Sequence, residues 1–131
     1  MSAADQYLAG LKVLIVEDEP FIALDLAFGV EDAGGIPLGP ASSVAQALKL
    51  IEDALPDAAI VDVDLPDGKI GPVLAALRPM VPVVVHTGVG LPELLRKAHP
   101  ELLVCTKPTT PSELARRLSA EISQHSQGEE S

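Results

Sequence analysis

Short aliphatic runs alternate along the chain with longer stretches in which apolar residues recur at helical spacing. The runs are continuous and do not alternate with polar residues, which is typical of strands buried on both faces of a parallel sheet. We therefore predict five strands, at residues 11–16, 36–38, 58–61, 81–86 and 102–105.

Turn and capping residues between these runs predict five helices. Gly34-Gly35 ends the first helix, and Ser42 or Ser43 caps the second. Thr110-Pro111-Ser112-Glu113 forms a capping box with proline at the first helical position of the last helix. The predicted helices span about residues 20–33, 43–54, 71–78, 91–98 and 111–123, and one stripe of the first carries Phe21, Leu24 and Phe28.

Strictly alternating strands and helices predict an α/β fold. The economical arrangement is a doubly wound, five-stranded parallel sheet of order 2-1-3-4-5, a flavodoxin-like architecture. This order leaves the weak second strand at an edge, where Pro37 and Pro40 remove the fewest hydrogen bonds. We expect an N-terminal extension at residues 1–10, one domain at 11–124 and a flexible tail at 125–131, with no further domain.

Composition narrows the functional classes. The 131 residues include 9 Lys or Arg and 19 Asp or Glu, a formal net charge of −10 that repels phosphate backbones and argues against direct nucleic-acid binding. The single cysteine, Cys105, excludes an internal disulfide and fits a reducing compartment. Neither a signal peptide nor a membrane-spanning run is visible, so we expect a cytoplasmic protein with no membrane insertion.

The polar residues that follow the predicted strands suggest a binding site. Glu17-Asp18, Asp62, Thr87 and Lys107 follow the first, third, fourth and fifth strands, whose carboxyl ends share one rim of the sheet. Each residue alone is also explained as an ordinary loop or capping residue. Together, the carboxylates Glu17, Asp18 and Asp62 offer the hard oxygen ligands that suit Mg²⁺.

The same set of residues fits phosphoryl transfer to a carboxylate. The chain has no Cys/His cluster for zinc and no glycine-rich phosphate loop. An aspartate can act as the nucleophile and form an acyl phosphate. In that reaction Lys107 would neutralise a phosphoryl oxygen, and Thr87 would donate a hydrogen bond to another.

These residues resemble the receiver domain of two-component response regulators over about residues 11–123. The resemblance rests on four segments in order: residues 13–20 (VLIVEDEP), 61–68 (VDVDLPDG), 83–88 (VVVHTG) and Lys107-Pro108. It implies that Asp62 is the phosphoacceptor and that Asp18 is a direct ligand of Mg²⁺ or Mn²⁺. It further implies that Glu17 acts through water, Asp64 supplies its backbone carbonyl to the metal, and Thr87 and Lys107 contact the phosphoryl group.

The resemblance also implies a mode of action. We expect a single-domain signalling protein, not an enzyme, that takes its phosphoryl group from a histidine kinase or phosphotransfer protein and acts on a separate protein target. The sequence is similar to alphaproteobacterial stand-alone receivers with a Phe-Ala-Thr-Gly-Tyr type fourth strand, but it departs from them at aromatic positions. In place of the usual Phe-Ala the fourth strand has Val85-His86, the usual Tyr is replaced by Val89, and the usual Phe after Lys107-Pro108 is replaced by Thr109. Cys105 occupies the fifth-strand position where many receivers carry a switch Tyr or Phe, so it is an atypical switch residue.

Two other functions compete with this hypothesis. One is a receiver-fold interaction module that works independently of phosphorylation, which the missing aromatic residues favour. The other is a small-molecule hydrolase or binding protein on the same kind of sheet. Cys105 is either a small buried hydrophobe or a redox-sensitive thiol, and His86 is either a buried histidine or a pH sensor.

Overall fold

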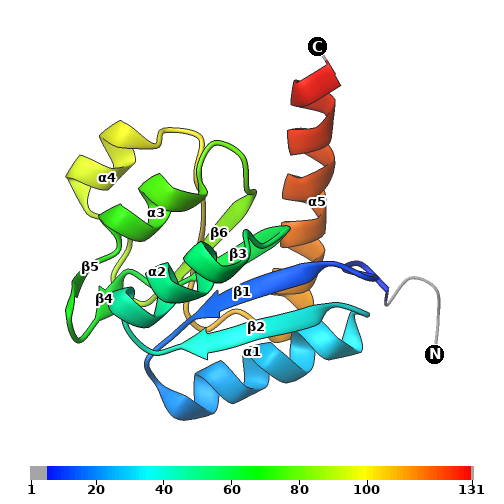
Figure 1. The fold of residues 1–131 in the computed structure, drawn as a ribbon, viewed down its shortest axis with the longest axis horizontal. Coiled ribbons are helices and arrows are strands. Elements are labelled where there is room, and N and C mark those ends of the chain that lie inside the picture. Colours follow the sequence, from blue (N-terminus) through cyan, green and yellow to red (C-terminus); the bar gives the residue numbers. More distant parts are fainter. Residues whose placement is uncertain (1–5, 131) are drawn as a thin grey trace.

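A computed structural model, which describes residues 6–130, contains a five-stranded parallel sheet of order β2-β1-β3-β6-β7 (Figure 1). The strands β4 and β5 form a separate two-stranded hairpin, so β6 and β7 are the fourth and fifth strands of the main sheet. The predicted strand order 2-1-3-4-5 is therefore confirmed. The elements are β1 (Lys12–Val16), α1 (Pro20–Asp32), β2 (Ile36–Ala41), α2 (Val44–Asp53), β3 (Ala58–Val61), β4 (Asp64–Leu65), β5 (Gly68–Lys69), α3 (Gly71–Leu77), β6 (Val83–Thr87), α4 (Glu93–Ala98), β7 (Leu103–Thr106) and α5 (Pro111–Glu130).

Helices cover both faces of the sheet, which explains the uninterrupted apolar strands. Successive side chains of a strand point to opposite faces, so each strand contributes to two separate cores. One core packs α2, α3 and α4 against Leu14, Val61 and Val85. The other packs α1 and α5 against Ile15, Ile60 and Val84.

Helix α1 turns its aromatic stripe away from the sheet. Phe21, Leu24 and Phe28 are 79%, 51% and 55% exposed. The sheet-facing stripe consists of Ala23, Leu26 and Val30, which are buried. Both stripes have the same spacing, and packing against the sheet selected the one with smaller side chains.

The predicted helix caps are present. Gly34 adopts a positive φ of 88°, and the amides of Gly34 and Gly35 donate to the carbonyls of Glu31 and Val30, which is a Schellman termination of α1. Of the two candidate serines, Ser43 caps α2, because its Oγ accepts from the amide of Gln46 at 3.1 Å.

The domain extends beyond the boundaries predicted for it. In the N-terminal extension, residues 1–5 lie outside the described residues, but Leu8 is fully buried and its amide donates to the carbonyl of Ala33 at 2.9 Å. At the other end α5 continues to Glu130, so its predicted end near residue 123 is too early. Residue 131 of the predicted tail lies outside the described residues. Within the described part of the chain, no helix combines the length and the apolar composition that a membrane span requires.

Candidate functional site

The four strand ends meet at one rim of the sheet. Lys107, which follows β7, places its Nζ 2.8 Å from Oδ2 of Asp62 and 2.9 Å from Oε1 of Glu17. Asp62 and Lys107 are 45 residues apart in the sequence, so only the parallel sheet brings them into contact. Thr87 is the last residue of β6, the strand between those that carry Asp62 and Lys107.

Backbone amides hold the two buried carboxylates in place. The Glu19 amide donates to Oε2 of Glu17 at 3.1 Å, and the Asp64 amide donates to Oδ1 of Asp62 at 3.1 Å. Glu17 is 1% exposed and Asp62 is 3% exposed. Each carboxylate therefore has one oxygen held by its own loop and the other beside the ammonium of Lys107.

Burial and charge have opposing effects on the protonation of these groups. Burial raises the pKa of Glu17, although its contacts with Lys107 and with the Glu19 amide partly offset the rise. Burial works against the charged form of Lys107, but its hydrogen bond to Asp62 and its ion pair with Glu17 outweigh that effect and raise the pKa of its ammonium. Two buried carboxylates thus share one cation, so the cluster retains an excess of negative charge.

This excess of negative charge suits a hard divalent cation. Glu17, Asp18 and Asp62 each offer a carboxylate oxygen, and these oxygens lie within 4.8 Å of one another. Oε1 of Glu17 is buried and has no hydrogen-bond partner among the described residues. Its negative charge is balanced by the ion pair with the ammonium of Lys107. Asp18 is exposed, which leaves one side of the cluster open to solvent. The residues therefore fit Mg²⁺ or Mn²⁺ with some water ligands retained.

Thr87 and Lys107 are connected through the backbone. The Lys107 amide donates to the carbonyl of Thr87 at 2.9 Å, continuing the β6–β7 ladder to the rim. The hydroxyl of Thr87 accepts from the Val89 amide at 3.2 Å, and the side chain is fully buried. The hydroxyl proton remains available to donate, as a phosphoryl contact would require.

Cys105 lies on the opposite face of the sheet from Thr87. It is the ladder partner of His86, and both belong to the face covered by α1 and α5. The β7 side chains on the face that carries Thr87 are Thr106, which is its ladder partner, and Val104, which packs in the other core. A direct coupling between Thr87 and Cys105 therefore has no geometric basis. Burial raises the pKa of the Cys105 thiol. The guanidinium of Arg117 partly offsets this rise, since its Nη1 lies 3.8 Å from Sγ of Cys105.

His86 is a second polar group buried beside the rim. It is 4% exposed, and neither ring nitrogen has a hydrogen-bond partner among the described residues. Burial lowers the pKa of His86, and the nearby charge of Lys107 lowers it further. The imidazole is therefore neutral at neutral pH and is not a cation that competes with Lys107.

Asp67 makes a structural contact that the sequence did not predict. Its two carboxylate oxygens accept from the amides of Val44 and Ala45, at the start of α2. Nothing in the local sequence points to this contact, because the partners lie 22 and 23 residues away.

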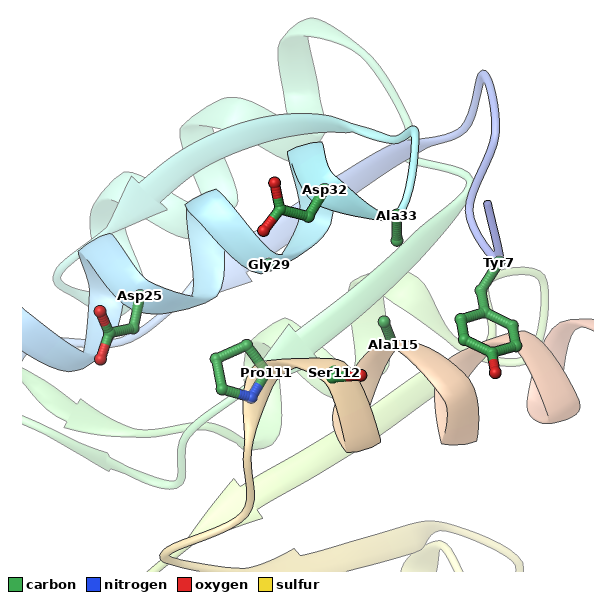
Figure 2. Close-up of a pocket in the computed structure, with 8 residues that line it drawn as sticks. All are labelled: Tyr7, Asp25, Gly29, Asp32, Ala33, Pro111, Ser112 and Ala115. Atoms are coloured by element: carbon green, nitrogen blue, oxygen red, sulfur yellow. The ribbon is translucent and has the colours of Figure 1, made fainter. Parts of the chain in front are cut away.

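A hollow of about 680 Å³ lies away from the rim, between α1 and the beginning of α5 (Figure 2). Figure 2 shows Asp25 and Asp32 on α1, and it shows Tyr7 beside α5 at the end of the hollow away from Asp25. The two helices approach closely beside it, because a Cβ added to Gly29 would lie 2.4 Å from Cβ of Pro111. None of the residues that line the hollow belongs to the carboxylate cluster.

Comparisons with known proteins agree with this geometry. No protein-family model matches the sequence. The transcriptional regulatory protein PdtaR of Mycobacterium tuberculosis is 35% identical over 89 residues, which are 66% of this chain and 43% of PdtaR. The phyllosphere-induced regulator PhyR of Methylorubrum extorquens is 39% identical over 61 residues, 46% of this chain and 23% of that protein. The chain thus spans less than half the length of these curated relatives.

Solved structures extend the similarity over nearly the whole chain. The receiver domain of Erythrobacter litoralis PhyR matches with a TM-score of 0.74 at 28% identity, covering 88% of this chain and 92% of that one. A CheY-like receiver domain from Methanospirillum hungatei matches with a TM-score of 0.81, covering 92% and 99%. Its 22% identity shows the fold alone.

The fold and these relatives define the chain as a response regulator receiver domain, a class of signalling modules. Within that class, PhyR proteins recur among both the sequence relatives and the structural neighbours.

Proposed function

We propose that the chain accepts a phosphoryl group on Asp62 from a histidine kinase or phosphotransfer protein, with Mg²⁺ or Mn²⁺ bound at the rim. The observation that carries this proposal is the position of Lys107, whose ammonium lies within 2.9 Å of both Asp62 and Glu17. A buried carboxylate beside an ammonium, in a cluster that suits a divalent cation, is equipped to receive a group with three charged oxygens.

The proposed reaction forms an acyl phosphate. A carboxylate oxygen of Asp62 attacks phosphorus, the new O–P bond forms as the P–N bond to the donor imidazole breaks, and that imidazole takes a proton from solvent. Lys107 and the Thr87 hydroxyl each contact a phosphoryl oxygen. The metal would be held by Asp18, Asp62 and the Asp64 carbonyl, with Glu17 acting through water, and would neutralise charge between the carboxylates and the phosphoryl oxygens. The protein promotes only its own phosphorylation and dephosphorylation.

The outer stripe of α1 supports a protein as phosphodonor. Helix α1 begins two residues after Asp18, so a partner bound along it lies next to the acceptor rim. Phe21, Leu24 and Phe28 form an exposed apolar stripe on this helix, and apolar surface of this kind is typical of protein contacts. We place the interaction in the cytoplasm, where a free thiol such as Cys105 stays reduced.

We propose that the signal then passes to a separate protein, whose identity is unknown, through direct contacts. The exposed Val89 and Leu94 follow Thr87 along the chain and supply apolar surface near it.

One observation favours a second candidate, a receiver-fold interaction module that works independently of phosphorylation. On the Thr87 face of β7 the side chains are Val104 and Thr106, so this strand offers no aromatic ring to rotate upon phosphorylation.

Intact-mass measurement after incubation with Mg²⁺ and acetyl phosphate tests the proposal. We expect the mass of one phosphate to be added, stable in acid and labile in base, in the wild-type protein. Asp62→Ala should abolish the adduct, whereas Asp64→Asn should retain it, because only the backbone carbonyl of Asp64 has a proposed role. Lys107→Ala should slow formation of the adduct while leaving the circular dichroism spectrum unchanged.

Three outcomes would contradict the assignment. An adduct that persists in Asp62→Ala would place the acceptor elsewhere. Failure of the folded wild-type protein to form any adduct would favour the interaction module. Turnover of the donor without a covalent adduct would favour the hydrolase alternative.

A further inference from the structure

The β4–β5 hairpin is tied to the N-terminus of α2 by a single carboxylate. Oδ1 of Asp67 accepts from the Val44 amide at 2.8 Å, and Oδ2 accepts from the Ala45 amide at 3.1 Å. The next amide of the helix, that of Gln46, donates to Ser43 at 3.1 Å. The first three amides of α2 are therefore satisfied, two of them by a residue far along the chain, where a helix ordinarily relies on a local cap.

The same hairpin is joined to the acceptor at its other end. Asp64 opens β4, pairs with Lys69 of β5, and donates its amide to Oδ1 of Asp62. A short path thus runs from the Asp62 carboxylate through the hairpin to the start of α2. The position of the hairpin sets where the Asp64 carbonyl lies relative to the Asp62 carboxylate.

Packing contributes little to the position of the hairpin. Residues 66–69 are all exposed, and Leu65 is only partly buried against the core. The buried residues that anchor the hairpin lie outside it, Val63 directly before β4 and Ile70 directly after β5. The two hydrogen bonds of Asp67 therefore carry much of the restraint on the exposed turn.

We propose that Asp67 is a positioning residue for the metal site: by docking the hairpin on α2, it holds the Asp64 carbonyl and the Asp62 carboxylate at the spacing that a divalent cation requires. This inference rests on the proposed function of the rim. The α2 amides lower the pKa of Asp67, so the carboxylate stays ionised and the contact persists at mildly acidic pH. Partners that orient metal ligands commonly change metal affinity about 10- to 100-fold when removed.

Mg²⁺ titration of the full chain by calorimetry tests this role without relying on phosphorylation. We expect Asp67→Ala to weaken Mg²⁺ binding about 10-fold. Asp67→Asn, which keeps a side-chain oxygen for one α2 amide, should restore part of the affinity. Ser43→Ala is the matched control, because it removes a cap from the same helix but leaves the hairpin attached, and it should not change Mg²⁺ affinity.

The results separate a positioning role from simple capping. Equal Mg²⁺ affinity in Asp67→Ala and wild type, or an equal loss in Ser43→Ala, would overturn the inference and leave Asp67 as a helix cap. Absence of Mg²⁺ binding in the folded wild-type protein would overturn it too. If the expected order of affinities holds but acetyl phosphate adds no phosphate to the wild type, the proposed acceptor function fails and the positioning role stands. Thermal unfolding of each variant verifies that the protein is folded.

Discussion

His86 is the buried polar residue whose surroundings suit it least. Its ring is nearly inaccessible to water, and both ring nitrogens lack a hydrogen-bond partner among the described residues. A buried polar group without a partner costs about 1–3 kcal/mol of stability. Its ladder partner Cys105 and its strand neighbour Val84 belong to the apolar core under α1 and α5, so a hydrocarbon side chain would suit the position better.

We predict that His86→Leu raises the free energy of unfolding by about 1 kcal/mol at pH 7, because it removes the unpaired nitrogens. The pKa of His86 is lowered in the folded protein, so the unfolded chain takes up a proton first as the pH falls. The wild type should therefore lose stability below about pH 6.5. The variant should lose less over the same range in urea denaturation series.

The control for this comparison is His99→Leu, at a partly exposed position. It should not raise the free energy of unfolding at pH 7, because it removes no fully buried polar group. A marked destabilisation by His86→Leu would contradict the prediction and would indicate that the imidazole makes a structural contact through water.

At the scale of elements, the contact between α1 and α5 determines where the segment after Lys107 runs. Gly29, in the last turn of α1, lies against Pro111 at the start of α5, with no room for a Cβ. Pro111 lies four residues after Lys107, so this close approach helps to fix the path of the loop that carries the ammonium. Glycine normally weakens a helix interior, and here packing explains its presence.

We expect Gly29→Ala to destabilise the protein by about 1–3 kcal/mol, because overpacking outweighs the gain in helix propensity. Gly71→Ala is the matched control at another helical glycine, where the nearest side-chain atom, of Leu95, lies 3.8 Å from the added Cβ. That variant should be neutral or stabilised by up to about 1 kcal/mol. Chemical denaturation of both variants checks the difference, and equal stabilities would contradict the packing argument.

At the scale of the whole molecule, the net charge of −10 is concentrated in part at the rim. Three carboxylates lie close together there, and Lys107 is the cation that the structure places against the two buried ones. Because the pKa of Glu17 is raised, ionising it costs folding free energy, and stability is lost as the pH rises through that pKa. A divalent cation would offset this cost.

We predict that Mg²⁺ raises the melting temperature, with a stabilisation of about 2.7 kcal/mol at a 100-fold excess over Kd. Asp18→Asn should remove most of this gain. Asp53→Asn, which removes an acid paired with Lys49 on α2, should preserve it. Differential scanning calorimetry at constant ionic strength measures the effect, and an equal gain in both variants would show only general charge screening.

Local patterns in the sequence are enough to predict the features that depend on neighbouring residues. Continuous aliphatic runs predicted the strands. Gly34-Gly35 predicted the end of one helix, Ser42 or Ser43 predicted the start of another, and the polar residues at the strand ends predicted the rim. These inferences succeed because strand burial, capping and the parallel topology leave local patterns. Most of the candidate site, including Asp62 and Lys107, is therefore predictable from the sequence alone.

Features that depend on contacts between distant segments are visible only in the folded protein. It turned Phe21 and Phe28 outward, placed Cys105 on the face away from Thr87, and docked Asp67 on α2. Each outcome reflects competition between alternatives that are equivalent in local sequence, such as two helix stripes of the same spacing. Packing against the sheet selects between these alternatives, as does the need of each buried backbone amide for a hydrogen-bond acceptor. The residues that meet both requirements lie far away along the chain.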